Sequence, residues 1–533
     1  MSTETKAVAV AVAEDQSDRE FVRGLGLTSS TMLVMGSMIG SGIFLVSAEI
    51  AREVGSPALL IAAWLVTGFM TIIAALSYGE LAAMMPRAGG QYVYLREALG
   101  PLWGFLYGWT LFLVIQTGTI AAVGVAFGKF LGVFFPSISS HNWIVGLHWV
   151  APKWQLGPMV LGGMDVGLNT QNLMAILLVI ALSIINIFGV KTGALIQNVF
   201  TSAKIAALLG LVLVGIIVGR NAVALAANFG ANFWRNVHGF HAVEVGSGGT
   251  AVFVGALTII AVAQVGSLFS ADAWNNVTFT AGEVINPKRN LPLSLALGTG
   301  AVIALYIACN FIYLNILPLH GSCEILNGNI CVEPARDTAT IVRHGIQYAT
   351  EDRVATAALS QMFGGIGAYL MAAAILVSTF GCNNGLILSG ARVYYAMSKD
   401  GLFFRGAGKL HPTHKTPAVS LMVQMVWICI LCLSGTYGQL LDYVVFAVLV
   451  FYILTIAGIF VLRRTRPDVP RPYKAFGYPV LPLVYIAMAI FIDVVLLRYK
   501  PQYTWPGLII VLLGIPVYFA WHARRPGKEA RAA

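Results

Sequence analysis

The sequence is poor in charge. Only 11% of its 533 residues are charged, whereas 58% are hydrophobic. A water-soluble protein carries about 25% charged residues. So few charges cannot cover a surface that faces water, but they suit a surface that faces lipid. The composition therefore argues against a set of soluble domains and indicates a membrane protein.

The sequence also lacks enzyme signatures. It has no G-x-x-x-x-G-K-[ST] loop for ATP, no H-E-x-x-H or similar metal-ligand cluster, and no convincing catalytic triad. The missing ATP loop argues against a primary pump on this chain. We therefore expect a protein that is not an enzyme and that uses no cofactor and no metal.

Cysteine is scarce as well, with six residues in the chain. Cys323 and Cys331 lie between two apolar runs, in a segment that we expect outside the membrane. A short-loop disulfide is plausible there if the segment faces an oxidising compartment, although spacing alone does not fix the geometry. The other four lie in apolar runs and are interpreted as small packing residues: Cys309, Cys382, Cys429 and Cys432.

Long apolar runs are abundant. A helix needs about 20 apolar residues to cross ~30 Å of hydrocarbon. Twelve runs meet this need, and we number them as spans 1 to 12: 30–51, 58–84, 102–134, 170–189, 196–219, 252–281, 291–317, 357–389, 417–434, 439–461, 479–498 and 503–522. The pattern predicts an all-α polytopic membrane protein with one transporter domain (29–522) between an N-terminal tail (1–28) and a C-terminal tail (523–533).

Lysine and arginine set the predicted orientation. They cluster in the 463–474 loop and in the C-terminal tail, and cytoplasmic segments carry the excess of these residues. We therefore predict a multi-pass protein of the cell inner membrane with both termini in the cytoplasm. The net charge of +10 is explained by this topology and by contact with anionic lipid, so no nucleic-acid partner is expected.

Span 1 contains a helix-weakening sequence. Gly40 and Gly42 flank Ser41 near the middle of the span, and each glycine costs up to ~1 kcal/mol relative to alanine. If the helix unwinds there, the next amides form the positive end of a second half-helix, which suits a carboxylate. The alternative is that these small residues only allow close helix packing.

Span 6 has a similar interruption. Asp272, Asn275 and Asn276 follow a long apolar run, and polar groups in lipid should face the protein interior or water. A break near 269–271 would free carbonyls that suit an ammonium group. Paired interruptions in two halves of a chain indicate a transporter's binding site. The alternative is that Asp272 only bonds neighbouring helices.

Lys204 is the only basic residue well inside a predicted span. It lies eight residues from the start of span 5, so ~12 Å deep. Its side chain could snorkel to the interface. Alternatively, its ammonium could tie span 5 to spans 1 and 8, and a buried lysine could also support proton coupling.

Two other spans offer polar residues for a pocket. In span 8 these are Ser378, Cys382 and Asn383, and in span 3 they are Gln116 and Thr117. Each could equally bond its own helix. Near the inner end of span 2, a glutamate at position 80 is interpreted as a gate or loop contact.

An ordered set of motifs resembles one family. The chain is similar to bacterial members of the amino acid–polyamine–organocation (APC) superfamily, nearest to the L-type amino-acid transporter-like branch, over about residues 24–522. The matching stretches are GSMIGSGIF (36–44), PRAGGQYVYLREALGPLWGFLYGW (86–109), NVFTSAKIAAL (198–208), WNNVTFTAGEVINPKRNLP (274–292), GARVYYAMSKDG (390–401), KTPAVS (415–420) and RPYKAFGYPVLP (471–482).

The resemblance implies a fold and a mechanism. Five-plus-five inverted repeats with discontinuous helices 1 and 6 would occupy about 29–219 and 252–461, with two extra helices at about 479–522. The implied function is secondary active transport of a free amino acid by alternating access, through sodium-independent exchange or proton symport. A polyamine or organic-cation transporter of the same fold and a non-transporting amino-acid sensor remain alternatives.

The resemblance also implies roles for individual residues. Lys204 would replace a sodium ion and contact Gly36 and Ser378. Phe269 would also act as a gate on the extracellular side. The implied substrate ligands are Gly40, Ser41 and Gly42 for the carboxylate, the carbonyls of Ile39, Phe269, Ser270 and Ala271 for the α-amine, and Asn275 and Asn276 nearby.

The chain departs from the family pattern at two places. Many relatives have glycine after the span 6 aspartate, where this chain has Ala273, so local flexibility would be reduced. Animal L-type relatives use a cysteine between spans 3 and 4 to link a glycoprotein. Residues 135–169 contain no cysteine, so no such partner is expected, and the expected partners are the amino-acid substrate and membrane lipid.

Overall fold

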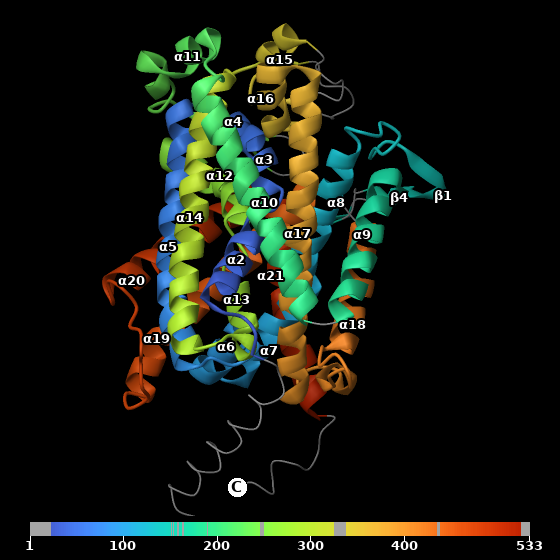
Figure 1. The fold of residues 1–533 in the computed structure, drawn as a ribbon. Helices are drawn as coiled ribbons and strands as arrows, with labels where there is room; N and C mark the ends of the chain where they lie inside the picture. The colour runs from blue at the N-terminus through green and yellow to red at the C-terminus, as the bar shows by residue number, and fades with distance from the viewer. Residues whose placement is uncertain are drawn as a thin grey trace, which may run out of the picture.

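Long helices that run side by side form most of the molecule (Figure 1). The computed structural model describes residues 23–523, apart from 151, 153, 157–158, 162–164, 189, 246–249, 324–336 and 434–436. The helix α6 lies at one end of the bundle, and α11 and α15 lie at the other (Figure 1). We refer to these ends as the α6 end and the α11 end.

The described chain consists of helices in its first and second parts and of three pairs of strands. The first part of the chain forms α2 (Leu27–Met38), α3 (Gly42–Leu45), α4 (Ser47–Val54), α5 (Pro57–Met84), α6 (Gln91–Leu99), α7 (Pro101–Thr110), the π-helix η1 (Leu111–Ile115), α8 (Gln116–Leu131), α9 (Thr170–Ile187), α10 (Val190–Ile217), α11 (Ala222–Asn228) and the 3-10 helix η2 (Gly230–Trp234). The second part forms α12 (Ala256–Ser270), α13 (Asn276–Phe279), η3 (Ala281–Glu283), α14 (Pro287–Ile316), α15 (Thr338–His344), η4 (Thr350–Asp352), α16 (Val354–Phe363), α17 (Gly365–Lys399), η5 (Arg405–Gly408), α18 (Ala418–Cys432), α19 (Tyr437–Thr465), α20 (Val480–Tyr499) and α21 (Pro501–Ala523). Three antiparallel pairs complete the described chain: β1 (Trp143–Val150) with β4 (Asp165–Asn169), β2 (Trp154–Leu156) with β3 (Met159–Leu161), and β5 (His241–Val245) with β6 (Thr250–Val254).

Within the described residues, ten helical segments are long and apolar enough to cross a membrane: Leu27–Leu45, Pro57–Met84, Pro101–Leu131, Thr170–Ile187, Leu195–Ile217, Pro287–Ile316, Gly365–Lys399, Val444–Thr465, Val480–Tyr499 and Thr504–Trp521. The expected runs 252–281 and 417–434 correspond to the shorter helices α12 and α18. The chain is therefore a mostly helical, multi-pass membrane protein.

Three sequence-based details were wrong. The all-α expectation omitted the three strand pairs, and β6 takes the first residues of the expected run 252–281. The expected run 357–389 is two helices, because Gly364 adopts a left-handed φ of 62° between α16 and α17. The expected depth of Lys204 agrees with the candidate span Leu195–Ile217, since Lys204 lies nine residues from its start.

Local sequence signals explain several helix ends. Proline at the first position begins α5, α7 and α14, where its missing N–H costs nothing and its fixed φ suits the helix. The Asn169 side chain caps α9 by accepting a hydrogen bond from the Asn172 amide. Gly55, with φ of 53°, ends α4 in the left-handed conformation that glycine adopts readily.

The helix α10 shows how the bundle is turned toward lipid. One face buries polar side chains, namely Gln197, Thr201 and Lys204. The opposite face exposes large apolar side chains: Leu195, Val199, Leu209, Leu213, Ile216 and Ile217. An apolar exterior with polar residues inside is expected of a helix that faces hydrocarbon. This arrangement places polar groups in the centre of the bundle, against α2 and α17.

Candidate substrate site

The first helix break separates α2 from α3. The helix α2 ends at Met38, Ile39 has a non-helical ψ of 86°, and α3 begins at Gly42. Just before the break, α10 packs closely against α2. A Cβ atom at Gly36 would lie 2.1 Å from the side chains of Gln197 and Thr201. Only glycine at position 36 allows α10 to approach α2 this closely.

The backbone carbonyls around this break are hydrogen-bonded by other helices. A helix leaves its last carbonyls without partners, and here side chains of α10, α14 and α17 supply the missing donors. The bonds run from Lys204 to Gly36 (2.6 Å) and Ile39 (2.8 Å), from Cys382 to Ser37 (3.1 Å), from Tyr306 to Met38 (3.0 Å), and from Ser378 to Ile39 (3.1 Å) and Gly40 (2.9 Å). The break is therefore a supported part of the fold.

Lys204 is fully buried in this arrangement. Its ammonium donates to the Gly36 and Ile39 carbonyl oxygens, so the side chain does not snorkel to the membrane interface. Ser378 shares the Ile39 carbonyl. A single cation thus joins α10 to the end of α2, and the hydroxyl from α17 completes the junction.

The second break separates α12 from α13. The helix α12 ends at Ser270 and α13 begins at Asn276. Between them, Ala273 has a left-handed φ of 63°, which costs a residue with a Cβ atom roughly 1 kcal/mol. Ala273 therefore occupies a strained position.

The two breaks pack directly against each other. A Cβ atom at Gly42 would lie 2.1 Å from Ser270 Oγ and 2.9 Å from Ser270 Cα, so position 42 has no room for a side chain. Phe269, Ser270 and Ala271 form the carbonyl end of α12 beside this contact. The positive end of one half-helix thus meets the negative end of another. The Ile39 carbonyl on the α2 side already accepts two side-chain hydrogen bonds.

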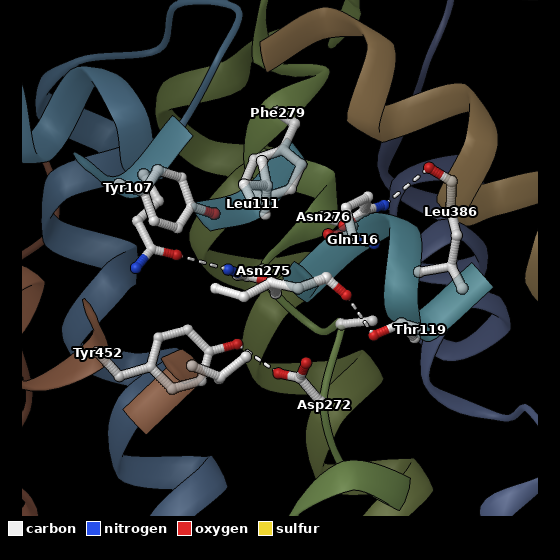
Figure 2. A pocket seen from close by; sticks show the side chains of 14 residues that line it. Tyr107, Leu111, Gln116, Thr119, Asp272, Asn275, Asn276, Phe279, Leu386 and Tyr452 are labelled. Carbon is white, nitrogen blue, oxygen red and sulfur yellow. Dashed lines mark hydrogen bonds between the residues drawn. The ribbon is translucent and has the colours of Figure 1, made fainter. Parts of the chain in front are cut away.

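A pocket begins immediately after the second break (Figure 2). Residues from α6, the α7–η1–α8 segment, the α12–α13 segment, α17 and α19 line it: Gln91, Tyr107, Leu111, Ile115, Gln116, Thr119, Asp272, Ala273, Asn275, Asn276, Phe279, Leu386, Val448 and Tyr452. The wall mixes carboxyl, amide and hydroxyl groups with apolar side chains. The lining therefore offers both hydrogen-bonding groups and apolar contacts.

Most polar groups of this pocket bond one another. Asp272 accepts a hydrogen bond from the Tyr452 hydroxyl (Figure 2). The Asn275 amide donates to the Gln91 side-chain oxygen at 2.8 Å. The Asn276 amide nitrogen is different, since it is buried and has no hydrogen-bond partner among the described residues.

The expected pocket residues divide into two groups. Gln116, Asn275 and Asn276 line the pocket. Thr117 instead donates to the Phe112 carbonyl at 2.7 Å, because the π-helix η1 shifts the backbone register before it.

Cys382 and Asn383 also lie away from the pocket lining. The Cys382 thiol donates to the Ser37 carbonyl, and the Asn383 amide fits against the Ile120 carbonyl and the Gly124 amide, each at 3.2 Å. Both side chains join α17 to its neighbours.

Sequence reasoning missed Gln91, Tyr107 and Tyr452 as pocket residues. Tyr107 and Tyr452 lie in apolar spans and carry hydroxyls that need partners inside the membrane, whereas Gln91 begins α6, outside the predicted spans. That requirement was the available signal, but it could not indicate which partner each residue would meet.

Glu80 forms a buried ionic contact near the α6 end. Its carboxylate accepts hydrogen bonds from Arg463 at 2.9 and 2.6 Å and from the Ala475 amide at 2.7 Å, and Arg471 lies 3.3 Å away. Arg463 also covers the Tyr478 ring. Glu80 is thus a loop contact that fastens the α19–α20 connection to α5.

A second ionic group holds α6 across the same end. Arg96 pairs with Asp400 at the end of α17, and Glu97 pairs with Arg466 at 2.9 Å. Burial opposes ionisation of Glu97, but hydrogen bonds from Arg96 and Arg466 lower its pKa below the usual value. The helix α6 is therefore tied to α17 and to the end of α19 by opposite charges.

Of the two cysteines that were expected to form a disulfide, only Cys323 lies within the described residues. Cys323 is disulfide-bonded, whereas Cys331 lies outside the described residues. The four cysteines in apolar runs are free: Cys309, Cys382, Cys429 and Cys432.

Residues 25–519 match the family model described as "Amino acid permease". The chain is 27% identical to the serine/threonine exchanger SteT of Bacillus subtilis over 510 residues, covering 95% of this chain and 99% of that protein. It is 27% identical over 500 residues to the human large neutral amino acids transporter small subunit 2, covering 93% and 79%. The human b(0,+)-type amino acid transporter 1 is also 27% identical over 500 residues, covering 93% and 87%.

Proposed function

This chain belongs to the amino acid permease family, and we propose that it exchanges free amino acids across the cell inner membrane, without sodium, by alternating access. It is a membrane transporter and not an enzyme. The relatives named as an amino-acid exchanger and as amino-acid transporters support this function. The observation that carries the proposal is the junction of two helix breaks, supported on one side by a buried lysine.

The proposed architecture has twelve membrane spans in a five-plus-five inverted repeat with two extra helices. The repeats would cover about 29–219 and 252–461, and the extra helices about 479–522. The two discontinuous helices are α2–α4 and α12–α13. The basic 463–474 loop supports a cytoplasmic α6 end, with cytoplasmic tails at 1–28 and 523–533.

The zwitterion would bind beside the Gly42–Ser270 contact that joins the two breaks. Backbone amides after Gly40, with the Ser41 hydroxyl, would hold the carboxylate, because they lie at the positive end of α3. The carbonyls of Ser270 and Ala271 would hold the amine more readily than that of Ile39, which already accepts two hydrogen bonds. Phe269 would close the site on the extracellular side.

Lys204 would supply a fixed charge where a sodium-dependent carrier would need a dissociable ion. Its ammonium bonds two α2 carbonyls, which is the role that a coordinated sodium ion would play. A permanent cation removes the need for external sodium. Proton symport would require Lys204 to release its proton during the cycle, so a pH gradient distinguishes that mode from exchange.

We propose that the protein works without a disulfide-linked glycoprotein. One human relative is named a small subunit, which implies an assembly for that protein. In this chain residues 135–169 contain no cysteine, so this segment offers no thiol for such a link. Lipid and the amino-acid substrate are the proposed partners.

Reconstitution into proteoliposomes tests the proposal. A panel of radiolabelled amino acids would be supplied outside, with and without unlabelled amino acid inside, with sodium replaced by choline, and with or without a pH gradient. We expect uptake that depends on internal amino acid and is indifferent to sodium. Binding without uptake would instead indicate a sensor, and uptake of polyamines alone would indicate the organic-cation alternative.

A further inference from the structure

One pocket amide lacks a partner although it is almost entirely buried. Asn276 begins α13 and is 1% exposed, and its Nδ2 atom has no hydrogen-bond partner among the described residues. A buried donor without an acceptor is costly. Its side chain is one of those that line the pocket (Figure 2), so a molecule in the pocket could supply the acceptor.

Other amides of the same pocket have their donors engaged. The Gln116 amide donates to the Leu386 carbonyl at 2.8 Å (Figure 2). The Asn275 amide donates to Gln91, which itself donates to Thr455 at 3.0 Å. These hydrogen bonds hold the Gln116, Asn275 and Gln91 side chains in place. Asn276 differs from them because its amide donor is unpaired among the described residues.

The pocket also lies where a substrate side chain would extend. Asp272 and Ala273, which line it, directly follow the carbonyls proposed to hold the α-amine. An amino acid bound by its α-groups at the two breaks would therefore place its side chain toward α13. The argument rests on the proposed transport function.

We propose that Asn276 determines which substrate side chains are preferred, and that it favours side chains with an oxygen acceptor, such as a hydroxyl or carboxamide. An acceptor oxygen pairs with the Asn276 amide, whereas an apolar side chain of equal size leaves it unpaired. An acidic side chain would meet Asp272 in the same pocket, and two carboxylates in one site disfavour each other. The surrounding Leu111, Ile115 and Val448 accommodate the aliphatic part of the side chain.

Threonine and valine test the inference because they have the same shape and differ by one hydroxyl. The kcat/KM for exchange would be measured for both in proteoliposomes containing the full chain. We expect the wild type to favour threonine by about tenfold or more, since a buried donor left unpaired costs about that factor. Glutamine and methionine form a second pair, for which the same preference is expected.

Variants then locate the selectivity. Asn276→Leu keeps the size of the side chain and removes the amide, so the threonine-to-valine ratio should fall to within about threefold of unity. The control is Asn315→Leu, since Asn315 in α14 also donates a hydrogen bond, to the Gly215 carbonyl, but does not line this pocket. The control should keep the wild-type ratio.

The outcomes separate this inference from the proposed function. If valine is exchanged as well as threonine by the wild type, the inference is wrong and exchange still stands. If no amino acid is exchanged, the proposed function itself fails. If Asn276→Leu does not reach the membrane, Asn276→Asp replaces the donor with an acceptor at constant shape, and the wild-type ratio still decides.

Discussion

The ammonium of Lys204 in α10 lies 2.6 Å from the carbonyl oxygen of Gly36 in α2. This contact joins residues 168 positions apart in the sequence, and it depends on position 36 having no Cβ atom that would keep α10 away. The end of α2 therefore depends on Lys204, whose depth in the membrane the sequence predicts only approximately.

Replacing Lys204 tests that dependence. Lys204→Ala leaves the Gly36 carbonyl without its lysine donor and the Ile39 carbonyl with Ser378 alone, and each charge-assisted bond is worth about 1.5 to 3 kcal/mol. Exchange should fall by at least about tenfold, which corresponds to about 1.4 kcal/mol. Initial rates in proteoliposomes measure the loss, with Lys409→Ala as the control because Lys409 is exposed. Wild-type rates in Lys204→Ala would mean that the lysine has no part in transport.

Gly42→Ala tests the contact between the two breaks. The added methyl group would lie 2.1 Å from Ser270 Oγ and 2.9 Å from Ser270 Cα, so backbone atoms would have to move. Overpacking of this kind costs typically about 1 to 3 kcal/mol, and exchange should be nearly abolished.

Gly300→Ala in α14 is the matched control for Gly42→Ala. A Cβ atom there meets nothing within 4 Å, and alanine favours a helix by about 1 kcal/mol over glycine. Thermal unfolding should show a small gain for the control and a loss for Gly42→Ala. Full activity of Gly42→Ala would show that the breaks separate in the working cycle.

Ala273→Gly should stabilise the protein. Ala273 has a φ of 63°, which glycine adopts at little cost, so the free energy of unfolding should rise by roughly 1 kcal/mol. Ala263→Gly in the middle of α12 is the matched control and should lower it by a similar amount. A detergent-solubilised melting curve measures both, and equal shifts of the same sign would refute the assigned strain.

Glu80→Gln should weaken the closure of the α6 end. The substitution removes the charge that faces Arg463 and Arg471 but keeps an acceptor for the Ala475 amide. Losing one partner of a largely buried ionic contact should cost roughly 2 to 3 kcal/mol. The unfolding temperature should fall, whereas Asp468→Asn in the exposed part of the same loop should leave it unchanged.

The helical frame was predictable because hydrocarbon forces long apolar runs. Ten of the twelve expected runs correspond to long spanning helices, and the positions of both breaks follow from glycine and polar residues inside such runs. The hairpin β5–β6 was missed because Thr250–Val254 is apolar and β-branched, a composition that fits the start of a helix span as well as a strand. The helix end at Gly364 was missed because glycine is also frequent inside membrane helices, so a glycine in an apolar run does not by itself mark an end.

The pocket was less predictable than the breaks. A glycine-rich break can be recognised from consecutive residues. The pocket wall instead joins Gln91, Tyr107 and Tyr452 from three separate helices. The π-helix η1 also turned Thr117 away and kept Gln116 inward, and no residue in 111–115 indicates that extra residue per turn. The proposed role of Asn276 could not be predicted from the sequence, because it rests on the folded structure, in which Asn276 Nδ2 has no hydrogen-bond partner among the described residues.

The two fastenings of the α6 end differ in how much water reaches them. Arg466 is 46% exposed where it meets Glu97, whereas Glu80 is only 2% exposed. Dissolved salt screens exposed charges over about 8 to 10 Å but affects buried ones much less. Raising the ionic strength at the α6 end should therefore weaken the Glu97–Arg466 contact that holds α6 more than the Glu80–Arg463 contact that holds α5.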